Sequence, residues 1–486
     1  VGLTVDERVA VYLEKRWETV VALFGAASAG GVFVPVNPLL KPAQVAYILR
    51  DCNVRVLITS AARLETLVGA LDQAHDLHTV IVVDADSEVP IAAGTRDVLP
   101  WERWMQLASA RALPPRIDND LAAILYTSGS TGQPKGVVLT HRNLMAGAMS
   151  VAEYLENRPH DRILAVLPLS FDYGLSQLTT AFHVGACAVL MNYLLPRDVI
   201  RAVAKERISG LAAVAPLWIQ LAQLHWPEPA MQSLRYITNS GGAMPRATLD
   251  ALRQRLPQSR IYLMYGLTEA FRSTYLPPEE LDRRPDSIGK AIPNAEILVL
   301  REDSTPCAPN EPGELVHRGA LVSRGYWNAP EKTAERFREI PGYGDALSIP
   351  ELAVWSGDTV RMDEEGFLYF IGRRDEMIKT SGYRVSPSEV EEVLYTSGLV
   401  GEAAALGVPH PVLGQAIVVV ATPRREEHPP SVQELLDECR RTLPAFMVPA
   451  HVDIRSGTLP RNSNGKIDRK GLSTAFADLF DAGNAI

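Results

Sequence analysis

The chain has little cysteine. Its 486 residues contain four, at positions 52, 187, 307 and 439, and no two of them lie within four residues of each other. This spacing offers neither a CxxC motif nor the neighbouring thiolates of a zinc site. Isolated thiols in a large chain are usually small core residues of a protein in a reducing compartment, so we expect a cytoplasmic protein.

The sequence also lacks an apolar run suited to a membrane and an excess of positive charge. Its longest uncharged stretch, residues 173–196, is interrupted by polar residues and glycines, so we interpret it as a buried helix and strand. Five of the first fifteen residues are charged, which predicts that no signal peptide starts there. A net charge of −9 argues against a broad surface for nucleic acid or an anionic membrane, although one local basic pocket is compatible with it.

What the chain does have is length and a regular alternation of patterns. At about 150 residues per domain, the length corresponds to roughly three domains. Short apolar runs alternate with amphipathic stretches almost throughout, which predicts an α/β fold with largely parallel sheets. The apolar runs include 54–58, 79–83, 163–167 and 186–191, and the amphipathic stretches include 17–29, 42–50 and 197–205.

Two later segments depart from this alternation. Residues 289–319 read as strands broken by four prolines, which predicts a small β-rich subdomain. Residues 367–382 are dense in charge and bounded by glycines, as expected of a joint between domains. A new alternation of helix and strand patterns follows, so we expect a small C-terminal domain.

The strongest motif is Tyr-Thr-Ser-Gly-Ser-Thr-Gly-Gln-Pro-Lys-Gly at residues 126–136, between two apolar runs. Glycines let backbone N–H groups approach phosphates, hydroxyls add donors, and Lys135 adds positive charge. The motif is not a Walker A loop, because Gly-Lys-[Ser/Thr] is missing. A Ser/Gly linker rarely separates two apolar strands, so the motif predicts a phosphate-binding loop.

Four shorter motifs are weak when taken singly. Met-Tyr-Gly-Leu-Thr-Glu at 264–269 combines an aromatic ring that can stack on a purine with oxygen ligands suited to Mg²⁺, and Trp-Ser-Gly-Asp at 355–358 offers a carboxylate for a diol. An ordinary turn would explain Ser-Gly-Gly-Ala at 240–243. A solvated surface lysine would explain Asn-Gly-Lys-Ile-Asp-Arg at 464–469. Their order along the chain is more informative than any one of them.

In this order, the motifs resemble those of the acyl-adenylate-forming enzymes, which include acyl-CoA synthetases, luciferases and adenylation domains of non-ribosomal peptide synthetases. The resemblance covers nearly the whole chain. It implies a large N-terminal adenylation core, residues 1–374, with two αβ sheets and a β-rich part at 289–372. A hinge would join it to a small, mobile α+β domain, residues 375–486. The resemblance also implies a further strand and helix upstream of Val1 in members of this family.

The resemblance implies a role for each motif residue, with ATP and Mg²⁺ as cofactors. Thr268 would contact phosphate, Glu269 would bind Mg²⁺, and Lys466 would be the catalytic lysine that holds the carboxylate against the α-phosphate. Asp375 would be the hinge residue. The remaining ATP-binding residues would be Thr127, Ser128, Gly129, Ser130, Thr131, Gly132 and Lys135 at the phosphates, Gly241, Gly242, Ala243, Tyr265 and Gly266 at adenine, and Asp358 and Arg373 at ribose or phosphate.

Two residues indicate which acid is activated. Asp172 stands where amino-acid-activating relatives place an aspartate that binds the substrate ammonium, and a helix cap or an internal ion pair is the alternative interpretation. Arg272 lies in a segment that lines the acyl pocket in the family, where it can bind a second carboxylate, with Ser240 adding a hydroxyl. The alternative is an arginine turned to solvent or paired with a protein acid.

Together, Asp172 and Arg272 predict an aspartate-like amino diacid such as 3-methylaspartate. The combination resembles the stand-alone β-amino-acid adenylation enzymes of macrolactam polyketide pathways. That resemblance implies transfer of the aminoacyl group to the phosphopantetheine thiol of a carrier protein, and it implies neither a nucleic-acid nor a membrane partner.

Other functions stay open from the sequence. An acyl-CoA ligase for a simple carboxylic acid would pair Asp172 internally and turn Arg272 away from the pocket. A nucleotide-binding protein without catalysis is disfavoured by the presence of Lys466, Thr268 and Glu269 together. A luciferase-like oxygenase is compatible with the fold but favoured by no residue. The apolar stretch 211–226 fits either a pocket wall or the core.

Overall fold

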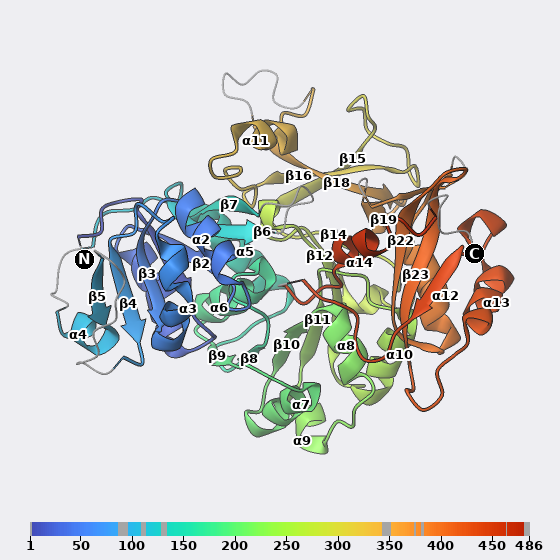
Figure 1. Ribbon diagram of the computed structural model, residues 1–486, viewed down its shortest axis with the longest axis horizontal. Coiled ribbons are helices and arrows are strands. Elements are labelled where there is room, and N and C mark those ends of the chain that lie inside the picture. The colour runs from blue at the N-terminus through green and yellow to red at the C-terminus, as the bar shows by residue number, and fades with distance from the viewer. Residues whose placement is uncertain are drawn as a thin grey trace.

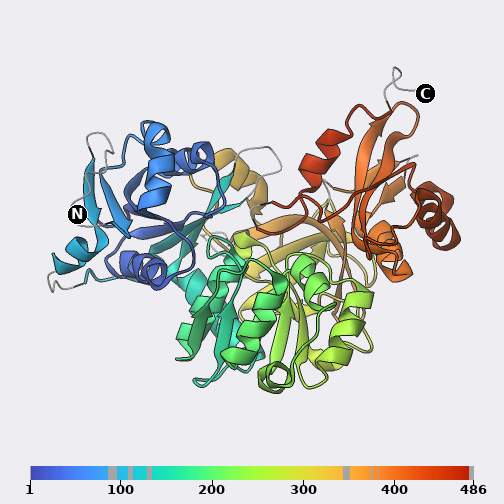
Figure 2. The same ribbon diagram turned by 60° about the horizontal axis from the view of Figure 1, so that its bottom comes forward.

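The computed structural model describes residues 2–85, 96–107, 113–127, 134–342, 351–373, 376–380, 383–462 and 464–480, without the side chains of residues 383 and 384. The described residues form four sheets, two of seven strands and two of five (Figure 1). The first two sheets and their helices precede a third, antiparallel sheet, and the fourth sheet belongs to the C-terminal part at the opposite end from the N-terminus (Figure 2).

The first sheet has the strand order β5-β4-β3-β1-β2-β6-β7 and is parallel except for the β6–β7 pair. Alternate residues of β1 belong to different cores: Val9 and Val11 pack on the side of α1, Ala10 and Tyr12 on that of α2 and α3. A parallel sheet needs apolar residues on both faces, which explains the continuous apolar runs. Its elements are β1 (Arg8–Tyr12), α1 (Trp17–Ser28), β2 (Val32–Pro35), α2 (Pro42–Asp51), β3 (Val54–Ser60), α3 (Ala61–Leu71), β4 (Thr79–Val83), β5 (Asp97–Pro100), α4 (Trp101–Gln106), β6 (Leu121–Thr127) and β7 (Lys135–Thr140).

The second sheet has the order β14-β13-β12-β11-β10-β8-β9, parallel from β12 to β9 and antiparallel at β13 and β14. Its strands are β8 (Arg162–Ala165), β9 (Cys187–Leu190), β10 (Gly210–Ala213), β11 (Tyr236–Asn239), β12 (Arg260–Tyr265), β13 (Thr274–Leu276) and β14 (Lys290–Ala291). The accompanying helices are α5 (His141–Tyr154), α6 (Asp172–His183), α7 (Pro196–Lys205), α8 (Ala215–Leu221), α9 (Glu228–Ser233) and α10 (Arg246–Arg255).

Helix α6 explains the long uncharged stretch of the sequence. Residues 172–181 are all buried, because Leu175 and Leu178 join the core of the first sheet while Tyr173 joins that of the second. A helix covered on all sides carries few charges. The sequence also predicts a buried strand in this stretch, and that prediction is wrong for β9. The residues of β9 are exposed or half-buried, because β9 is the edge strand beside β8.

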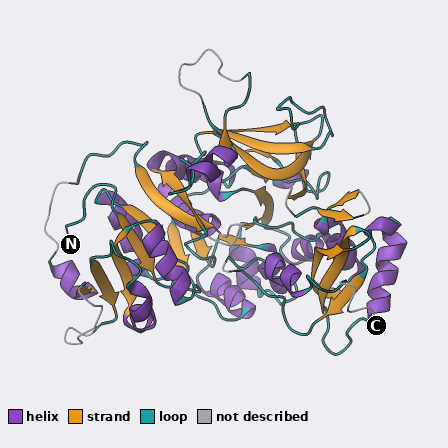
Figure 3. Ribbon diagram, turned by 45° about the horizontal axis from the view of Figure 1, so that its top comes forward, coloured by secondary structure: helices purple, strands orange, loops and turns teal. Residues whose placement is uncertain are grey.

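The third sheet is antiparallel and contains β15 (Ala295–Leu300), β16 (Gly313–Gly319), β17 (Phe337–Arg338), β18 (Ala353–Met362) and β19 (Leu368–Arg373), with α11 (Pro330–Arg336) beside β17 (Figure 3). The β-rich character expected after residue 289 is present. However, Lys290 and Ala291 pair with β13 and extend the second sheet.

The fourth sheet begins within the charged, glycine-bounded segment, at β20. It contains β20 (Ile378–Thr380), β21 (Tyr383–Val385), β22 (Val400–His410), β23 (Gly414–Pro423) and β24 (His451–Ile454), with α12 (Pro387–Ser397), α13 (Val432–Thr442) and α14 (Arg469–Ala475). Its apolar residues form a core of their own, as expected of a separate small domain. In the described part of the chain, we find no helix with the length and apolar character needed to cross a membrane.

Candidate active site

Several of the expected site residues gather at the carboxyl ends of three strands of the second sheet. Strand β8 leads to Asp172, β11 leads directly to Ser240 and Gly241, and β12 ends at Tyr265, shortly before Glu269. These strands are parallel, so their carboxyl ends lie at one edge of the sheet even though the residues are far apart in sequence.

Glu269 lies in a short 3-10 helix, Thr268–Ala270, and accepts a hydrogen bond from the hydroxyl of Tyr326 at 2.5 Å. The Nζ of Lys135 lies 5.0 Å from the centre of the Tyr326 ring. Sequence reasoning missed Tyr326, which carries no motif of its own. Its segment pairs with β7 through the Val137–Tyr326 bridge, and this pairing brings it beside the end of the phosphate motif.

Tyr265 and Asp358 connect the second sheet with the third. The phenol of Tyr265 donates a hydrogen bond to Oδ2 of Asp358, and Nε of Arg373 lies 3.8 Å from the other carboxylate oxygen. Burial, reinforced by the charge of Asp358, raises the pKa of Tyr265 well above its usual value. The phenol therefore stays neutral and can donate. The Asp358 carboxylate is thus oriented by a donor, as a ligand for hydroxyl groups requires.

Lys466 reaches this site from the C-terminal domain. Its Nζ lies 5.5 Å from the centre of the Phe171 ring, and a Cβ placed on Gly241 would lie 2.9 Å from its Cε. Burial lowers the pKa of Lys466, and the carboxylates of Asp172 and Asp358 oppose that shift. The lysine side chain is therefore a desolvated cation placed among the acidic residues of the site.

The loop that carries Lys466 is held by Asn462. The side-chain oxygen of Asn462 accepts hydrogen bonds from the backbone N–H groups of Asn464 at 3.0 Å and Lys466 at 3.1 Å. The Asn462 backbone N–H donates to the Lys466 carbonyl at 2.8 Å. These bonds close a tight turn that presents the lysine. Asn462 was not among the expected site residues, because an Asn-Ser-Asn-Gly sequence reads as an ordinary turn.

Asp172 and Arg272 form a buried pair next to these groups. Asp172 is the first residue of α6, and its Oδ2 lies 3.8 Å from Nη1 of Arg272. The two residues are 4% and 3% exposed. The hydroxyl of Thr268 donates to Oδ1 of Asp172 at 3.3 Å, and the Arg272 guanidinium lies 4.6 Å from the centre of the Tyr173 ring.

This pair is incompletely hydrogen-bonded. The Arg272–Asp172 contact is too long for a hydrogen bond, and Nη2 of Arg272 has no hydrogen-bond partner among the residues that the structure describes. Arg272 also has φ of 138° and follows Phe271 at φ of 45°, a strained backbone that is typical of functional sites. Asp172 thus has the internal partner expected of a CoA ligase, whereas Arg272 is not turned to solvent.

The other expected residues are placed as follows. Ser240 is buried at the end of β11, next to the glycine that contacts Lys466. Gly242 accepts a hydrogen bond from the Asn239 side chain at 2.9 Å. Trp218 and Trp226 are buried core residues whose indole N–H groups donate to backbone carbonyls, so the apolar residues of the stretch 211–226 belong mainly to the core. Ser128, Gly129, Ser130, Thr131, Gly132 and Asp375 lie outside the described residues.

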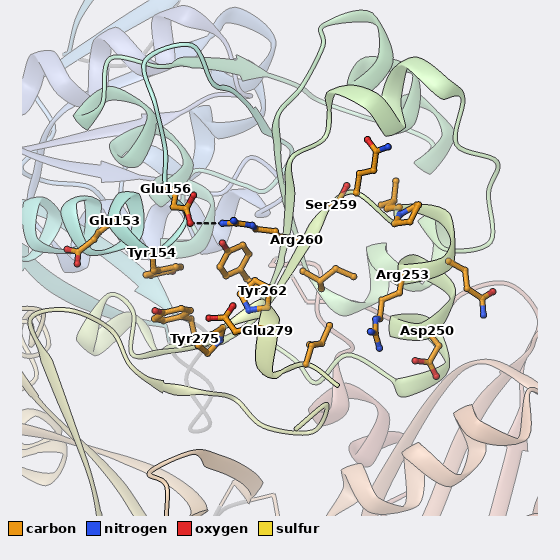
Figure 4. Close-up of a pocket in the computed structure, with 18 of the residues that line it drawn as sticks. Glu153, Tyr154, Glu156, Asp250, Arg253, Ser259, Arg260, Tyr262, Tyr275 and Glu279 are labelled. Atoms are coloured by element: carbon orange, nitrogen blue, oxygen red, sulfur yellow. Dashed lines mark hydrogen bonds and ion pairs between the residues drawn. The ribbon is translucent and has the colours of Figure 1, made fainter. Parts of the chain in front are cut away.

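A large cavity lies elsewhere and is not this site. It has a volume of about 1170 Å³ and is lined by the ends of α5, α10 and β12 and by the turn after β13. Figure 4 shows Tyr154 beside Tyr275 in this cavity and Arg260 paired with Glu156. Arg260 begins β12 and Tyr265 ends it, so the two regions are separated by on the order of 15 Å of strand.

Comparison with known proteins relates the whole chain to one family. The family model described as AMP-binding enzyme matches residues 1–327, and the one described as AMP-binding enzyme C-terminal domain matches residues 389–466.

Curated relatives with different substrates match at similar levels. An L-proline–[L-prolyl-carrier protein] ligase of Streptomyces coelicolor is 33% identical over 97% of this chain and 88% of that protein. A long-chain-fatty-acid–CoA ligase of Escherichia coli O157:H7 is 30% identical over 97% of this chain and 86% of that protein. A linear gramicidin synthase protein of Brevibacillus parabrevis is 32% identical over 100% of this chain, which spans only 6% of that protein's length.

Solved structures agree with these matches. An anthranilate CoA ligase in complex with anthranoyl-AMP has a TM-score of 0.86 at 25% identity, covering 98% of this chain and 89% of that one. An o-succinylbenzoate CoA synthetase from Bacillus subtilis, in complex with ATP and a magnesium ion, has a TM-score of 0.80 at 26% identity, covering 97% and 90%. The site described above therefore belongs to a fold that occurs with ATP in one relative and with an acyl-adenylate in another.

Proposed function

This chain belongs to the family of AMP-binding enzymes, and from that premise we propose that it activates a carboxylic acid by adenylation at the expense of ATP. We propose further that the acid is an aspartate-like β-amino diacid such as 3-methylaspartate, and that the acceptor is the phosphopantetheine thiol of a carrier protein. In this proposal the protein resembles the β-amino-acid adenylation enzymes of macrolactam pathways.

The observation that carries the substrate proposal is the buried, loosely paired Asp172 and Arg272. Burying two charges without good hydrogen bonds costs free energy, which a ligand can recover by supplying the missing partners. An amino diacid offers an ammonium to Asp172 and its second carboxylate to Arg272. The long Asp172–Arg272 contact would then be replaced by two ion pairs, each between one protein side chain and one group of the substrate. A fatty or aryl acid offers neither group.

The reaction follows from the placement of the remaining residues. An oxygen of the substrate carboxylate that is to be activated attacks the α-phosphorus of ATP. The bond from the α-phosphorus to the oxygen that bridges it to the β-phosphorus breaks, and pyrophosphate leaves with that oxygen. Lys466 would contact both the carboxylate and the α-phosphate, offsetting their repulsion and aligning them. Asp358 and Tyr265 would hold the nucleoside.

The donor set at Glu269 suits magnesium. Mg²⁺ is usually held by one or two carboxylates together with substrate phosphates, and the described residues contain no group of three or more His, Cys, Asp or Glu side chains that could bind a metal alone. Glu269 would hold the ion, and Thr268 would contact phosphate beside it. When bound, it neutralises phosphate charge.

A second candidate, an acyl-CoA ligase for a simple acid, is favoured by one observation. Asp172 already has a cationic partner in Arg272, so a neutral substrate would leave no carboxylate unpaired. The two candidates differ in the groups that the substrate must carry.

The deciding experiment is acid-dependent ATP–pyrophosphate exchange with aspartate, 3-methylaspartate, β-phenylalanine, α-amino acids and fatty acids. We expect the highest kcat/KM with an amino diacid. Arg272→Gln and Asp172→Asn should each lower it by about 100-fold or more, since breaking a buried charge pair costs about 3–5 kcal/mol. Arg260→Gln, which breaks a half-exposed ion pair at the opposite end of β12, should change it little. Highest exchange with a fatty acid, unaffected by Arg272→Gln, would establish the second candidate instead.

A further inference from the structure

A group of basic side chains lies beside the Tyr326–Glu269 pair. Helix α11 contributes Lys332 and Arg336, which are one turn apart and half-buried, whereas Glu331 and Glu335 on the same helix are exposed. Residues four apart share a helix face. The basic face of α11 is therefore turned inward, and its acidic face is turned to solvent.

Arg336 lies between two parts of the proposed ATP site. Its Nη1 donates a hydrogen bond to the carbonyl oxygen of Trp355 at 3.1 Å, and a Cβ placed on Gly357, which precedes Asp358, would collide with this nitrogen. Arg336 is also close to Tyr326, whose phenol donates a hydrogen bond to Glu269. A triphosphate that extends from a ribose at Asp358 towards a metal ion at Glu269 would pass this guanidinium.

Lys135 adds a third cation next to Tyr326. Its Nζ lies over the Tyr326 ring at 5.0 Å. Burial and the positive charges of Lys332 and Arg336 lower the pKa of Lys135, against the opposing effect of Glu269. Three cations thus lie near one another, and the carboxylates that act on Lys135 are the half-buried Glu269 and the exposed Glu335. The excess of positive charge favours a polyanion.

We propose that Lys332 and Arg336, together with Lys135, bind the pyrophosphate that leaves during adenylation. The inference rests on the proposed function and adds to it two residues that no motif indicates. As the bond to the α-phosphorus breaks, negative charge accumulates on the departing phosphate. Fixed cations stabilise such developing charge, and the planar guanidinium can bind two phosphate oxygens at once.

The first measurement is ATP–pyrophosphate exchange at varied pyrophosphate concentration. Arg336→Gln should raise the KM for pyrophosphate by at least about tenfold, which corresponds to about 1.4 kcal/mol, and leave the KM for the acid unchanged. Lys332→Gln should have a smaller effect in the same direction, and Arg336→Lys an intermediate one. Arg338→Gln is the matched control, because Arg338 is exposed and stacks on the Trp355 ring at 4.0 Å.

The second measurement is calorimetric titration of the purified protein with magnesium pyrophosphate, which needs no turnover. The Kd for magnesium pyrophosphate should be higher in Arg336→Gln than in the unaltered protein, and it should be unchanged in Arg338→Gln. An unchanged Kd and KM in Arg336→Gln, or an equal loss in Arg338→Gln, would overturn the inference. If the unaltered protein binds pyrophosphate but exchanges with no acid, the proposed function fails while the binding site stands.

Discussion

The ammonium group of Lys466 occupies a position that is costly without a substrate. Burial lowers its pKa, and the carboxylates of Asp172 and Asp358 compensate only in part. Two anionic groups, an acid and a phosphate, would restore the lost solvation. The ammonium of Lys466 is therefore more favourably placed when the reactants of adenylation are bound than when they are absent.

Replacing Lys466 should separate the two half-reactions. Lys466→Ala should lower the rate of adenylation by about 100-fold or more, since one electrostatic contact to a transition state contributes about 3–4 kcal/mol, but should leave transfer from a preformed adenylate to the thiol nearly intact. Lys470→Ala, an exposed lysine on the next helix, is the control. Equal losses in both half-reactions would show that Lys466 is needed for thiol transfer as well, and would contradict a rotation of the C-terminal domain that withdraws the lysine after adenylation.

The same lysine predicts a pH dependence. Its pKa is lowered, so it loses its proton at a lower pH than an ordinary lysine, and only the protonated form can bridge two anions. The kcat/KM of adenylation, which reports on the free enzyme, should therefore fall as the pH rises through that lowered pKa. Lys466→Arg should lack this decrease. A decrease at the same pH in both proteins would assign it to another group.

At the scale of elements, Arg272 is held by its neighbours on both sides. Phe271 is fully buried against α5, and the hydroxyl of Ser273 bonds Nδ1 of His317 at 2.9 Å. Burial lowers the pKa of His317 to about 3, so its ring is neutral at physiological pH. The strained backbone at Arg272 is thus maintained by packing and a hydrogen bond from two different elements.

A glycine of α5 tests this support. A Cβ on Gly147 would lie 2.6 Å from Cδ1 of Phe271, and overpacking of this kind costs about 1–3 kcal/mol, more than the gain of up to about 1 kcal/mol from helix propensity. Gly147→Ala should therefore lower the free energy of unfolding and raise the KM for a diacid. Gly25→Ala, in α1 with open space around it, should stabilise the protein in the same urea titration. Stabilisation by Gly147→Ala would show that Phe271 is not held there.

At the scale of the whole molecule, the site exists only where the domains meet. The second sheet contributes Asp172 and Glu269, the third contributes Asp358, and the C-terminal domain contributes Lys466. A further contact between the domains is the backbone N–H of Arg246, which donates to Glu392 on α12 at 3.1 Å. A rotation of the C-terminal domain would withdraw the lysine and leave the acyl and nucleotide residues in place.

Gly241 tests the importance of this contact between domains. Gly241→Ala would place a Cβ 2.9 Å from Cε of Lys466, so adenylation should fall at least about tenfold (about 1.4 kcal/mol) while thiol transfer from preformed adenylate is retained. Gly185→Ala is the matched control, because Gly185 has a similar backbone φ, 70° against 80° for Gly241. A Cβ placed on Gly185 would meet no other atom within 4 Å. Gly185→Ala should have no kinetic effect. If both variants lose adenylation equally, general destabilisation is the cause.

Much of the fold could be predicted because its signals are local. The strands at 54–60 and 79–83 and the helices at 17–28 and 42–51 occur where periodicity places them, since burial on both faces of a parallel sheet requires apolar runs. The edge position of β9 and the pairing of β14 with β13 were not readable, because strand order depends on partners that lie far away in the chain.

The sequence by itself determined the α/β class, the order of the motifs and the chemistry that each residue type can supply. These depend on side-chain type and short-range spacing. Only the tertiary structure decided that Asp172 meets Arg272, one hundred residues later, that Tyr326 lies beside Glu269, and that Arg336 lies near Tyr326. Contacts of this kind arise where strand ends from separate sheets converge, and no local pattern in the chain records that convergence.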